Sequence, residues 1–167
     1  MTRTGFVLDK TPNLLTKRKE CVMKKYMTKA LSLAKEAAKM GEVPVGAVIV
    51  KDGEIIATGK NTRECEHSPL AHAEINAIKQ ASEHLRSWRL DGCTMYVTLE
   101  PCPMCMGAII NARIENLVFG AFDLKAGACG SVVNLNKYPF NHHPEMIGGI
   151  MEDECSAILS GFFKKIR

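Results

Sequence analysis

The chain lacks several features that would set it apart from ordinary globular proteins. None of its apolar runs approaches the roughly 18 to 20 residues that a membrane span requires, so the sequence argues against a membrane protein. It contains no internal repeats and no low-complexity tract. Residues 1–22 show neither the apolar stretch of a secretory signal nor the pattern of a transit peptide. With 167 residues, 46% of them apolar, we expect one domain that acts in the cytoplasm.

A disulfide framework is also missing. The sequence has seven cysteines, an odd number, and only Cys102 and Cys105 have the spacing of metal ligands. This usage indicates a reducing compartment, in which the other five cysteines are free thiols.

Strong charge of one sign is absent from most of the chain. The sequence holds 22 Lys and Arg against 18 Asp and Glu. Residues 1–25 contain seven of those basic and two of those acidic residues, which leaves 15 basic against 16 acidic residues elsewhere. Bulk charge therefore gives no reason to predict nucleic-acid binding.

Hydrophobic periodicity predicts alternating helices and strands. Residues 1–22 have weak periodicity and predict a flexible extension, followed by a single domain at 23–167. The predicted helices cover residues 24–40, 71–82, 104–111 and 153–165. The predicted strands cover residues 45–50, 55–58, 95–99 and 117–120, with one more short strand at 131–135 inside a long loop. Strands that alternate with helices indicate an α/β layer fold.

Two short clusters carry the chemistry. His72-Ala73-Glu74 is followed, after 26 residues, by Pro101-Cys102-Pro103-Met104-Cys105. One imidazole and two thiolates supply three zinc ligands and leave the fourth tetrahedral position open. The pattern H-x-E…P-C-x-x-C is the known signature of zinc-dependent nucleobase deaminases. It predicts His72, Cys102 and Cys105 as metal ligands and zinc-bound hydroxide as the nucleophile.

Glu74 has a separate predicted role. A carboxylate as a fourth ligand would close the open position, so we expect Glu74 to act as the general acid and base. The alternative is a structural zinc site closed by a fourth cysteine such as Cys93 or Cys129, but such a site has no use for Glu74.

Further stretches outside the metal motif carry a resemblance to a known family. They are Gly41 to Ala47, Asn61, Ser87 to Leu90, Tyr96 to Leu99, Val118 to Ala121 and Asn141-His142. On these residues the chain, from about Lys24 onward, resembles the cytidine-deaminase-like zinc deaminases and, within them, the bacterial tRNA-specific adenosine deaminases. The resemblance implies a three-layer α/β fold, with a central mixed sheet of about five strands flanked by helices.

The resemblance also implies an activity and partners. The reaction would be hydrolytic deamination of adenosine to inosine at the wobble position (34) of an arginine tRNA. The enzyme would be a homodimer with one zinc ion per subunit. Asn61 would contact the purine edge, the Ala73 backbone the flipped base and Asp123 the ribose or its neighbour. Asn141 and His142 would hold anticodon-loop nucleotides, and Phe162 and Phe163 would cradle the loop.

The residues alone leave other interpretations open. Asn61 could shape a turn, Asp123 could bond its own backbone, and Phe162 could face the core. His143 stands where the family commonly has Arg, which removes a permanent charge. Two other functions remain as alternatives: a free-base deaminase, for example of guanine, and a non-catalytic zinc module that binds RNA.

Overall fold

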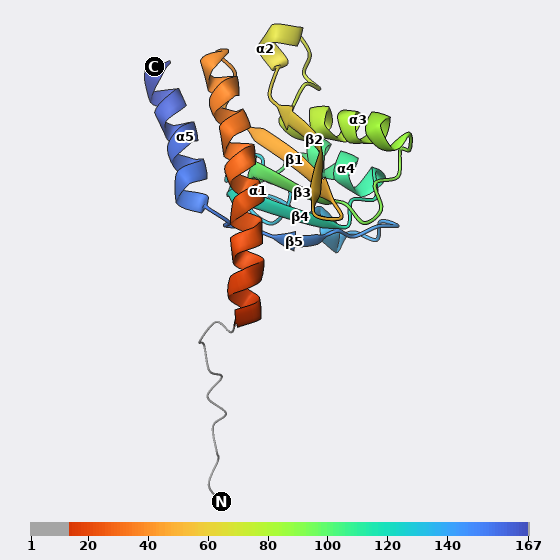
Figure 1. Ribbon diagram of the computed structural model, residues 1–167. Helices are drawn as coiled ribbons and strands as arrows, with labels where there is room; N and C mark the ends of the chain where they lie inside the picture. The colour runs from red at the N-terminus through yellow and green to blue at the C-terminus, as the bar shows by residue number, and fades with distance from the viewer. Residues whose placement is uncertain (1–13, 167) are drawn as a thin grey trace, which may run out of the picture.

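One five-stranded mixed sheet lies at the centre of the computed structural model, which describes residues 14–166 (Figure 1). The strands are β1 (Gly46–Lys51), β2 (Glu54–Lys60), β3 (Thr94–Leu99), β4 (Asn116–Ala121) and β5 (Glu145–Ile147), and they pair in the order β2-β1-β3-β4-β5. β1 runs antiparallel to both β2 and β3, whereas β3, β4 and β5 are parallel. The helices are α1 (Leu14–Lys39), α2 (Arg63–Glu66), α3 (Ala73–Leu85), α4 (Pro103–Asn111) and α5 (Glu152–Lys165).

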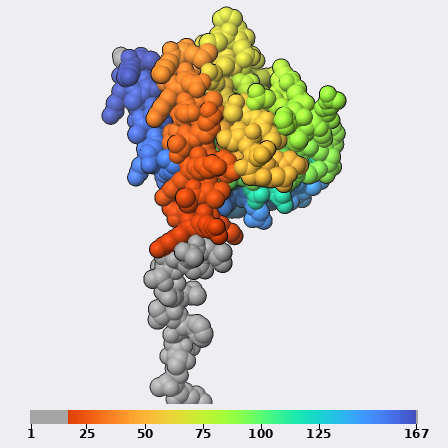
Figure 2. Space-filling view, in the orientation of Figure 1, coloured from red at the N-terminus to blue at the C-terminus, as the bar shows by residue number. Residues whose placement is uncertain are grey.

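Helices cover both faces of this sheet because successive side chains of a strand point to opposite sides. Ala47, Ile49 and Val97 pack with buried residues of α3 and α4. Val48 and Tyr96, from alternate positions of the same strands, pack with α1. Figure 2 shows α1, in red to orange, running beside α5, in blue. The fold is therefore the α/β layer fold that the alternation of elements predicts, with the three layers and the mixed sheet that the resemblance implies.

Two glycines let helices rest directly on the sheet. A side chain at Gly46 would collide with the backbone of α1 at Ala30, and one at Gly59 would collide with the Ala73 carbonyl group. Because Ala73 opens α3, the contact at Gly59 seats the first turn of that helix on β2. That turn carries the predicted catalytic cluster.

Most predicted elements are confirmed, with shifts of a few residues at their ends. The turn between β1 and β2 has Asp52 and Gly53 at positive φ (50° and 81°), as a tight hairpin requires. The first helix, however, begins at Leu14, so residues 14–22 of the predicted extension are helical. An ion pair between Glu20 and Lys24 (2.7 Å) spans one turn of this segment. Residues 1–13 lie outside the described part of the chain.

The predicted strand at 131–135 is wrong. This segment contains an isolated bridge between Cys129 and Asn134, followed by a short 3-10 helix at Leu135–Lys137. No strand forms because the Ser131 N–H donates to the Glu100 carboxylate, and the N–H groups of Val132 and Val133 donate to the Gly127 carbonyl oxygen within the same loop. Conversely, the sequence analysis missed β5, whose three residues are too few to show a period.

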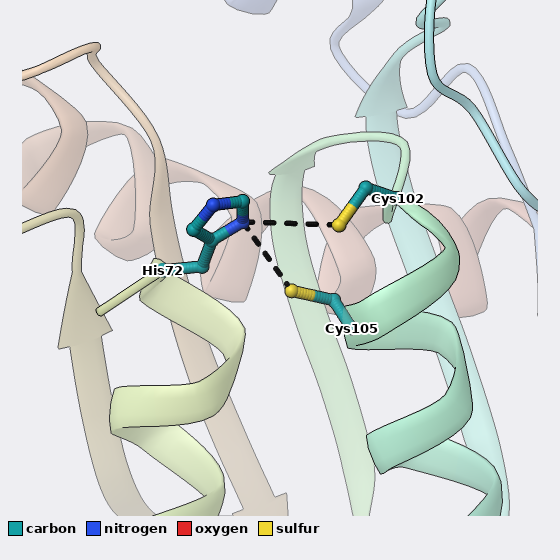
Figure 3. Close-up of side chains that lie close together, drawn as sticks. All are labelled: His72, Cys102 and Cys105. Carbon is teal, nitrogen blue, oxygen red and sulfur yellow. Dashed lines mark hydrogen bonds between the residues drawn. The ribbon is translucent and has the colours of Figure 1, made fainter. Parts of the chain in front are cut away.

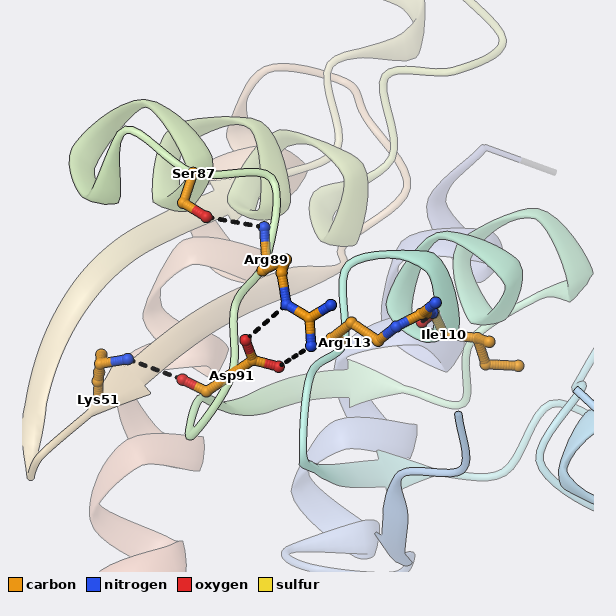
Figure 4. Close-up of polar contacts among 6 residues, drawn as sticks. All are labelled: Lys51, Ser87, Arg89, Asp91, Ile110 and Arg113. Atoms are coloured by element: carbon orange, nitrogen blue, oxygen red, sulfur yellow. Dashed lines mark hydrogen bonds and ion pairs between the residues drawn. The ribbon is translucent and has the colours of Figure 1, made fainter. Parts of the chain in front are cut away.

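A polar cluster fixes the connection from α3 into β3 (Figure 4). The Arg89 guanidinium donates two hydrogen bonds to the Asp91 carboxylate (2.9 and 3.2 Å). The Lys51 ammonium group donates to the Asp91 carbonyl oxygen (2.7 Å), which ties the end of β1 to the same connection. These groups are exposed, so we assign them an ordering role at the start of β3 and little stability.

None of the helices in the described residues is long and apolar enough to cross a membrane. All seven cysteines lie within the described residues, and none of them forms a disulfide.

Candidate metal centre and active-site cavity

The three predicted metal ligands meet where two helices begin (Figure 3). His72 is the residue that caps the start of α3, and Cys102 caps the start of α4. Cys105 lies in the first turn of α4, so the i to i+3 spacing brings both sulfurs to one side. The free N–H groups and dipole of a helix start favour thiolates at this position.

The separations of these atoms fit a tetrahedral zinc ion. His72 Nδ1 lies 3.8 Å from Cys102 Sγ and 3.5 Å from Cys105 Sγ. Zinc–nitrogen and zinc–sulfur bonds of about 2.05 and 2.3 Å, at the tetrahedral angle, would separate N and S by about 3.6 Å. Among the described residues this cluster has three members, and neither Cys93 nor Cys129 belongs to it. The donor set therefore fits a zinc site with one position open to solvent or substrate.

The pKa values of the three groups reflect their close contact. Hydrogen bonding with Cys102 raises the pKa of the His72 imidazole. Hydrogen bonding from Cys105, aided by His72, lowers the pKa of the Cys102 thiol to about 4, although burial opposes this. The contact with Cys102, together with burial, raises the pKa of the Cys105 thiol far above its usual value. A metal ion that binds both sulfurs as thiolates must therefore displace a proton.

A cavity of about 220 Å³ opens beside the cluster. Its lining residues are Val43, Val45, Asn61, Arg63, His72, Glu74, Leu99, Glu100, Cys102, Asp123 and Ala126. Glu74 is 4% exposed, and burial raises the pKa of its carboxyl group to about 7. A carboxyl group with this pKa can both accept and donate a proton near neutral pH.

Asn61 lines the cavity at the end of β2 and also supports α3. Its Oδ1 atom accepts a hydrogen bond from the Ala73 N–H (2.9 Å), one residue after His72. Within residues 14–166 the Asn61 Nδ2 group has no hydrogen-bond partner, so its donors remain available to a ligand. The Ala73 N–H is occupied by this bond, and Ala73 does not line the cavity. A hydrogen bond from the Ala73 N–H to a base would require Asn61 to release it.

Asp123 lines the cavity wall, and its own side chain stabilises the turn in which it lies. Its Oδ1 atom accepts hydrogen bonds from the N–H groups of Lys125 (2.9 Å) and Ala126 (3.2 Å). The side chain is half-buried and borders the cavity, so it combines the turn-forming role with access to the site.

A second hollow of about 340 Å³ adjoins the cavity. The two share Val43, Leu99 and Asp123, and the hollow adds Phe122, Lys125, Leu159 and Phe163. Phe163 is 43% exposed in this hollow, whereas its neighbour Phe162 is half-buried and does not line it. We call the residues Phe122, Lys125, Leu159 and Phe163 the outer groove.

Asn141 and His142 lie far from the cavity of their own chain. They precede β5, whose first residue pairs with Asn116 at the beginning of β4. The His142 Nε2–H donates to the Ile114 carbonyl oxygen (2.7 Å), just before β4. The metal cluster follows the opposite end of the sheet, after β3. A strand of six residues separates the two ends by about 17 Å.

The sequence analysis missed Glu42, Glu100 and Arg63. Glu42 and Glu100 are 1% and 2% exposed, although charged residues are rarely buried. The Glu42 carboxylate accepts the Cys65 N–H (2.9 Å) and so holds α2, from which Arg63 reaches the cavity. Glu42 stands inside a stretch that carries the family resemblance and Glu100 directly follows another, and a carboxylate next to apolar residues was the signal that could have found them.

Comparisons with known proteins agree with this geometry. A model of the MafB19-like deaminase family matches residues 22–167. The tRNA-specific adenosine deaminase of Bacillus subtilis is 51% identical over 143 residues, 85% of this chain and 89% of that protein. A solved structure from work on A-to-I editing by tRNA:A34 deaminases is 44% identical, with a TM-score of 0.79 over 81% of this chain and 99% of that one.

A further structural relative bears on the alternative substrate. The guanine deaminase of Bacillus subtilis is also 44% identical, with a TM-score of 0.57. Its similarity covers only 59% of this chain and 64% of that one. The similarity to the tRNA:A34 deaminase structure therefore extends over more of both chains.

Proposed function

Because the chain belongs to the MafB19-like deaminases and to the tRNA-specific adenosine deaminases, we propose that it converts the wobble adenosine (position 34) of an arginine tRNA to inosine. The observation that carries this proposal is the buried Glu74 beside an open three-ligand cluster in one cavity. The proposal places the enzyme in the cytoplasm, where thiols stay reduced.

His72, Cys102 and Cys105 would hold one zinc ion per subunit. When bound, the ion would lower the pKa of a water molecule toward about 7 and supply hydroxide near neutral pH. Thiolate and imidazole donors prefer zinc to magnesium or calcium, which take oxygen ligands.

Glu74 would manage the protons of the reaction. As a carboxylate it would accept a proton from the attacking water and deliver it to the ring nitrogen beside the amino-bearing carbon. Once again a carboxylate, it would take the remaining proton from the added hydroxyl group and pass it to the amino group, which leaves as ammonia while the carbonyl bond of the product forms. Burial supports both steps because it raises the pKa of Glu74 to about 7. Near neutral pH the side chain is then present both as carboxylate and as carboxylic acid.

Asn61 and Asp123 would position the nucleoside. Asn61 lines the cavity, and its Nδ2 donors, which have no partner within residues 14–166, suit acceptor atoms on a purine edge. Asp123, at the junction of the cavity and the outer groove, suits the ribose or its neighbour. The cavity admits one base, so the edited nucleotide must leave the stack of its loop before it enters.

The outer groove would hold nucleotides beside the edited one. Phe122 and Phe163 are exposed aromatic rings, and Lys125 adds a positive charge next to them. Stacking on aromatic rings combined with a nearby cation is how proteins commonly bind unpaired nucleotides. This local arrangement makes binding of an anticodon loop compatible with the near-neutral charge of residues 26–167.

The proposal includes a homodimer. Asn141 and His142 lie at the end of the sheet opposite the cavity, so within one chain they would not reach its substrate. A second copy could bring them to the cavity of the first. Sedimentation equilibrium at micromolar concentration, with and without a stem-loop RNA, tests this part of the proposal.

The test of the activity is inosine formation on an arginine anticodon stem-loop that bears adenosine at the wobble position. The same stem-loop with guanosine at that position is the control, and free adenosine, guanine and cytosine are assayed in parallel. We expect inosine in the stem-loop alone. Ammonia release from free guanine, with the stem-loop unchanged, would favour the free-base alternative. Stem-loop binding without any ammonia would favour the non-catalytic module.

A further inference from the structure

Glu100 is a buried carboxylate that the proposed chemistry does not use. It is 2% exposed, and no Lys, Arg or His in the described residues forms an ion pair with it. Burying a charge without a counterion is costly unless hydrogen bonds compensate for it. The partners of Glu100 therefore indicate what the residue is for.

Every compensating donor comes from one loop. Oε2 accepts the Asp123 N–H (3.0 Å) and the Ser131 hydroxyl group. Oε1 accepts the N–H groups of Cys129 (2.9 Å) and Ser131 (3.1 Å). A side chain at Gly127 would collide with this carboxylate, so the loop closes directly around it. With about four acceptor sites on two oxygens, the carboxylate has no capacity left to serve as a base.

The position of Glu100 links this loop to the metal cluster. Glu100 is separated from Cys102 by Pro101 alone, so a rigid three-residue segment carries both the loop anchor and a metal ligand. The Pro101 carbonyl oxygen also accepts the Ala128 N–H (2.8 Å) from the same loop. Asp123, whose N–H is bound by Glu100, presents its side chain to the cavity. The distance between the metal cluster and the Asp123 wall is therefore set through Glu100.

We propose that Glu100 is a positioning residue for substrate binding, which acts by holding the loop 123–131 at a fixed distance from the metal cluster. This inference rests on the proposed function, because Asp123 must contact the tRNA substrate for its position to matter. Glu42 supports the other wall in a similar way, through the N–H of Cys65 in α2. It therefore offers a matched control at a second buried carboxylate.

The test compares Glu100→Gln with Glu42→Gln in the full-length zinc protein. An amide in place of the carboxylate turns one acceptor into a donor that faces an N–H group. We expect faster hydrogen exchange at the Asp123, Cys129 and Ser131 amides in Glu100→Gln, and no change at these three amides in Glu42→Gln. Ser131→Ala, which keeps the carboxylate, should show the same effect to a smaller extent and remains informative if Glu100→Gln folds poorly.

Binding separates positioning from a purely structural role. The ligand is a stem-loop that carries inosine at the wobble position, because the product cannot be deaminated. We expect Glu100→Gln to bind it roughly tenfold more weakly, because a released loop no longer holds Asp123 against the RNA and one lost hydrogen bond to a charged group has about that effect. In steady-state kinetics KM should rise more than kcat falls. The absorption spectrum of the cobalt-substituted protein should stay that of the wild type.

Each result decides between the alternatives. Faster hydrogen exchange in the loop with unchanged stem-loop binding would mean that Glu100 has only a structural role. Unchanged hydrogen exchange would mean that Glu100 does not anchor the loop. An altered cobalt spectrum with unchanged binding would mean that Glu100 acts through Cys102. Failure of the wild-type protein to bind the stem-loop would refute the proposed function. Binding by the wild type is therefore measured before any variant is compared with it.

Discussion

The Asn61 Oδ1 atom and the Ala73 N–H form a hydrogen bond of 2.9 Å that joins the end of β2 to the start of α3. The bond lies one residue beyond His72, so it fixes the turn that carries a proposed metal ligand. The same side chain lines the cavity, and its Nδ2 donors have no hydrogen-bond partner within residues 14–166. Asn61 therefore combines a structural contact with a proposed contact to the base.

Two substitutions separate these roles of Asn61. Asn61→Asp keeps an acceptor for the Ala73 N–H but loses the Nδ2 donors, so it should retain zinc while KM for the stem-loop rises roughly tenfold or more. Asn61→Ala loses both contacts and should also lower the melting temperature. Zinc analysis, thermal unfolding and kinetics check this. Equal kinetics for Asn61→Asp and the wild type would mean that the Nδ2 group of Asn61 does not contact the base.

Glu74→Gln should abolish most turnover without disturbing the fold. The amide has nearly the shape of the carboxyl group but cannot accept the proton of the attacking water. We expect kcat to fall by roughly 10² to 10⁴, the usual contribution of general acid–base catalysis. Zinc content should remain one per chain. The melting temperature should stay equal or rise, since a buried ionisable group is replaced by a neutral one. A variant with near-normal kcat would exclude Glu74 from the mechanism.

The sequence predicts the metal cluster well because a known signature links His72 with Cys102 and Cys105, although His72 and Cys102 are 30 residues apart. Cys102 and Cys105 are three residues apart at a helix start, and strand alternation already places the sheet between two helical layers. The partners of Glu100 could not be predicted in the same way. Its donors at Asp123, Cys129 and Ser131 lie 23 to 31 residues away along the chain. They meet it only because the loop lacks regular structure, and that loop had been predicted to contain a strand.

The positions of Asn141 and His142 illustrate the same limit. Motif matching assigns them to the substrate, but it carries no information about which end of the sheet they occupy. Their place in the fold follows from the pairing of β5 with β4. A strand of three residues is too short for the sequence to predict this pairing.

Zinc affinity should fall as the pH is lowered. The pKa of Cys105 is raised, so its thiol is protonated at neutral pH without metal, and binding must release that proton. Lower pH therefore favours the proton over zinc, by roughly tenfold per pH unit for each proton released. Chelator competition between pH 6 and 8 measures this slope. A pH-independent affinity would mean that Cys105 is not bound as a thiolate.

Two cysteine substitutions test the composition of the cluster. Cys102→Ser should lose most of the zinc, whereas Cys129→Ser should retain it, because Cys129 lies outside the three-member cluster and its Sγ contacts Met106 Sδ (3.7 Å). Loss of zinc in Cys129→Ser would instead support a closed structural site with four protein ligands.

A chain that begins at Met23 should keep both the fold and the activity. The side chains of residues 17–22 are exposed, and Met23 is the first of the side chains described from residue 17 onward that packs against the buried cluster of α1. The truncated protein loses the exposed ion pair of Glu20 with Lys24, and exposed pairs contribute little. We expect a melting temperature within about 3 °C of the full chain and unchanged kcat/KM. A loss of stem-loop binding alone would assign the N-terminal segment to RNA contact.

Phe162 and Phe163 are adjacent in α5, but they should respond differently to substitution. Phe163 is 43% exposed in the outer groove, and a base stacked on an aromatic ring contributes about 1 to 3 kcal/mol. Phe163→Ala should therefore raise KM for the stem-loop by roughly tenfold while the melting temperature stays nearly the same. Phe162 is half-buried and does not line the groove, so Phe162→Ala should lower the melting temperature and leave KM unchanged. The reverse pattern would mean that α5 turns its other side to the RNA, and the outer groove would then lose its proposed role.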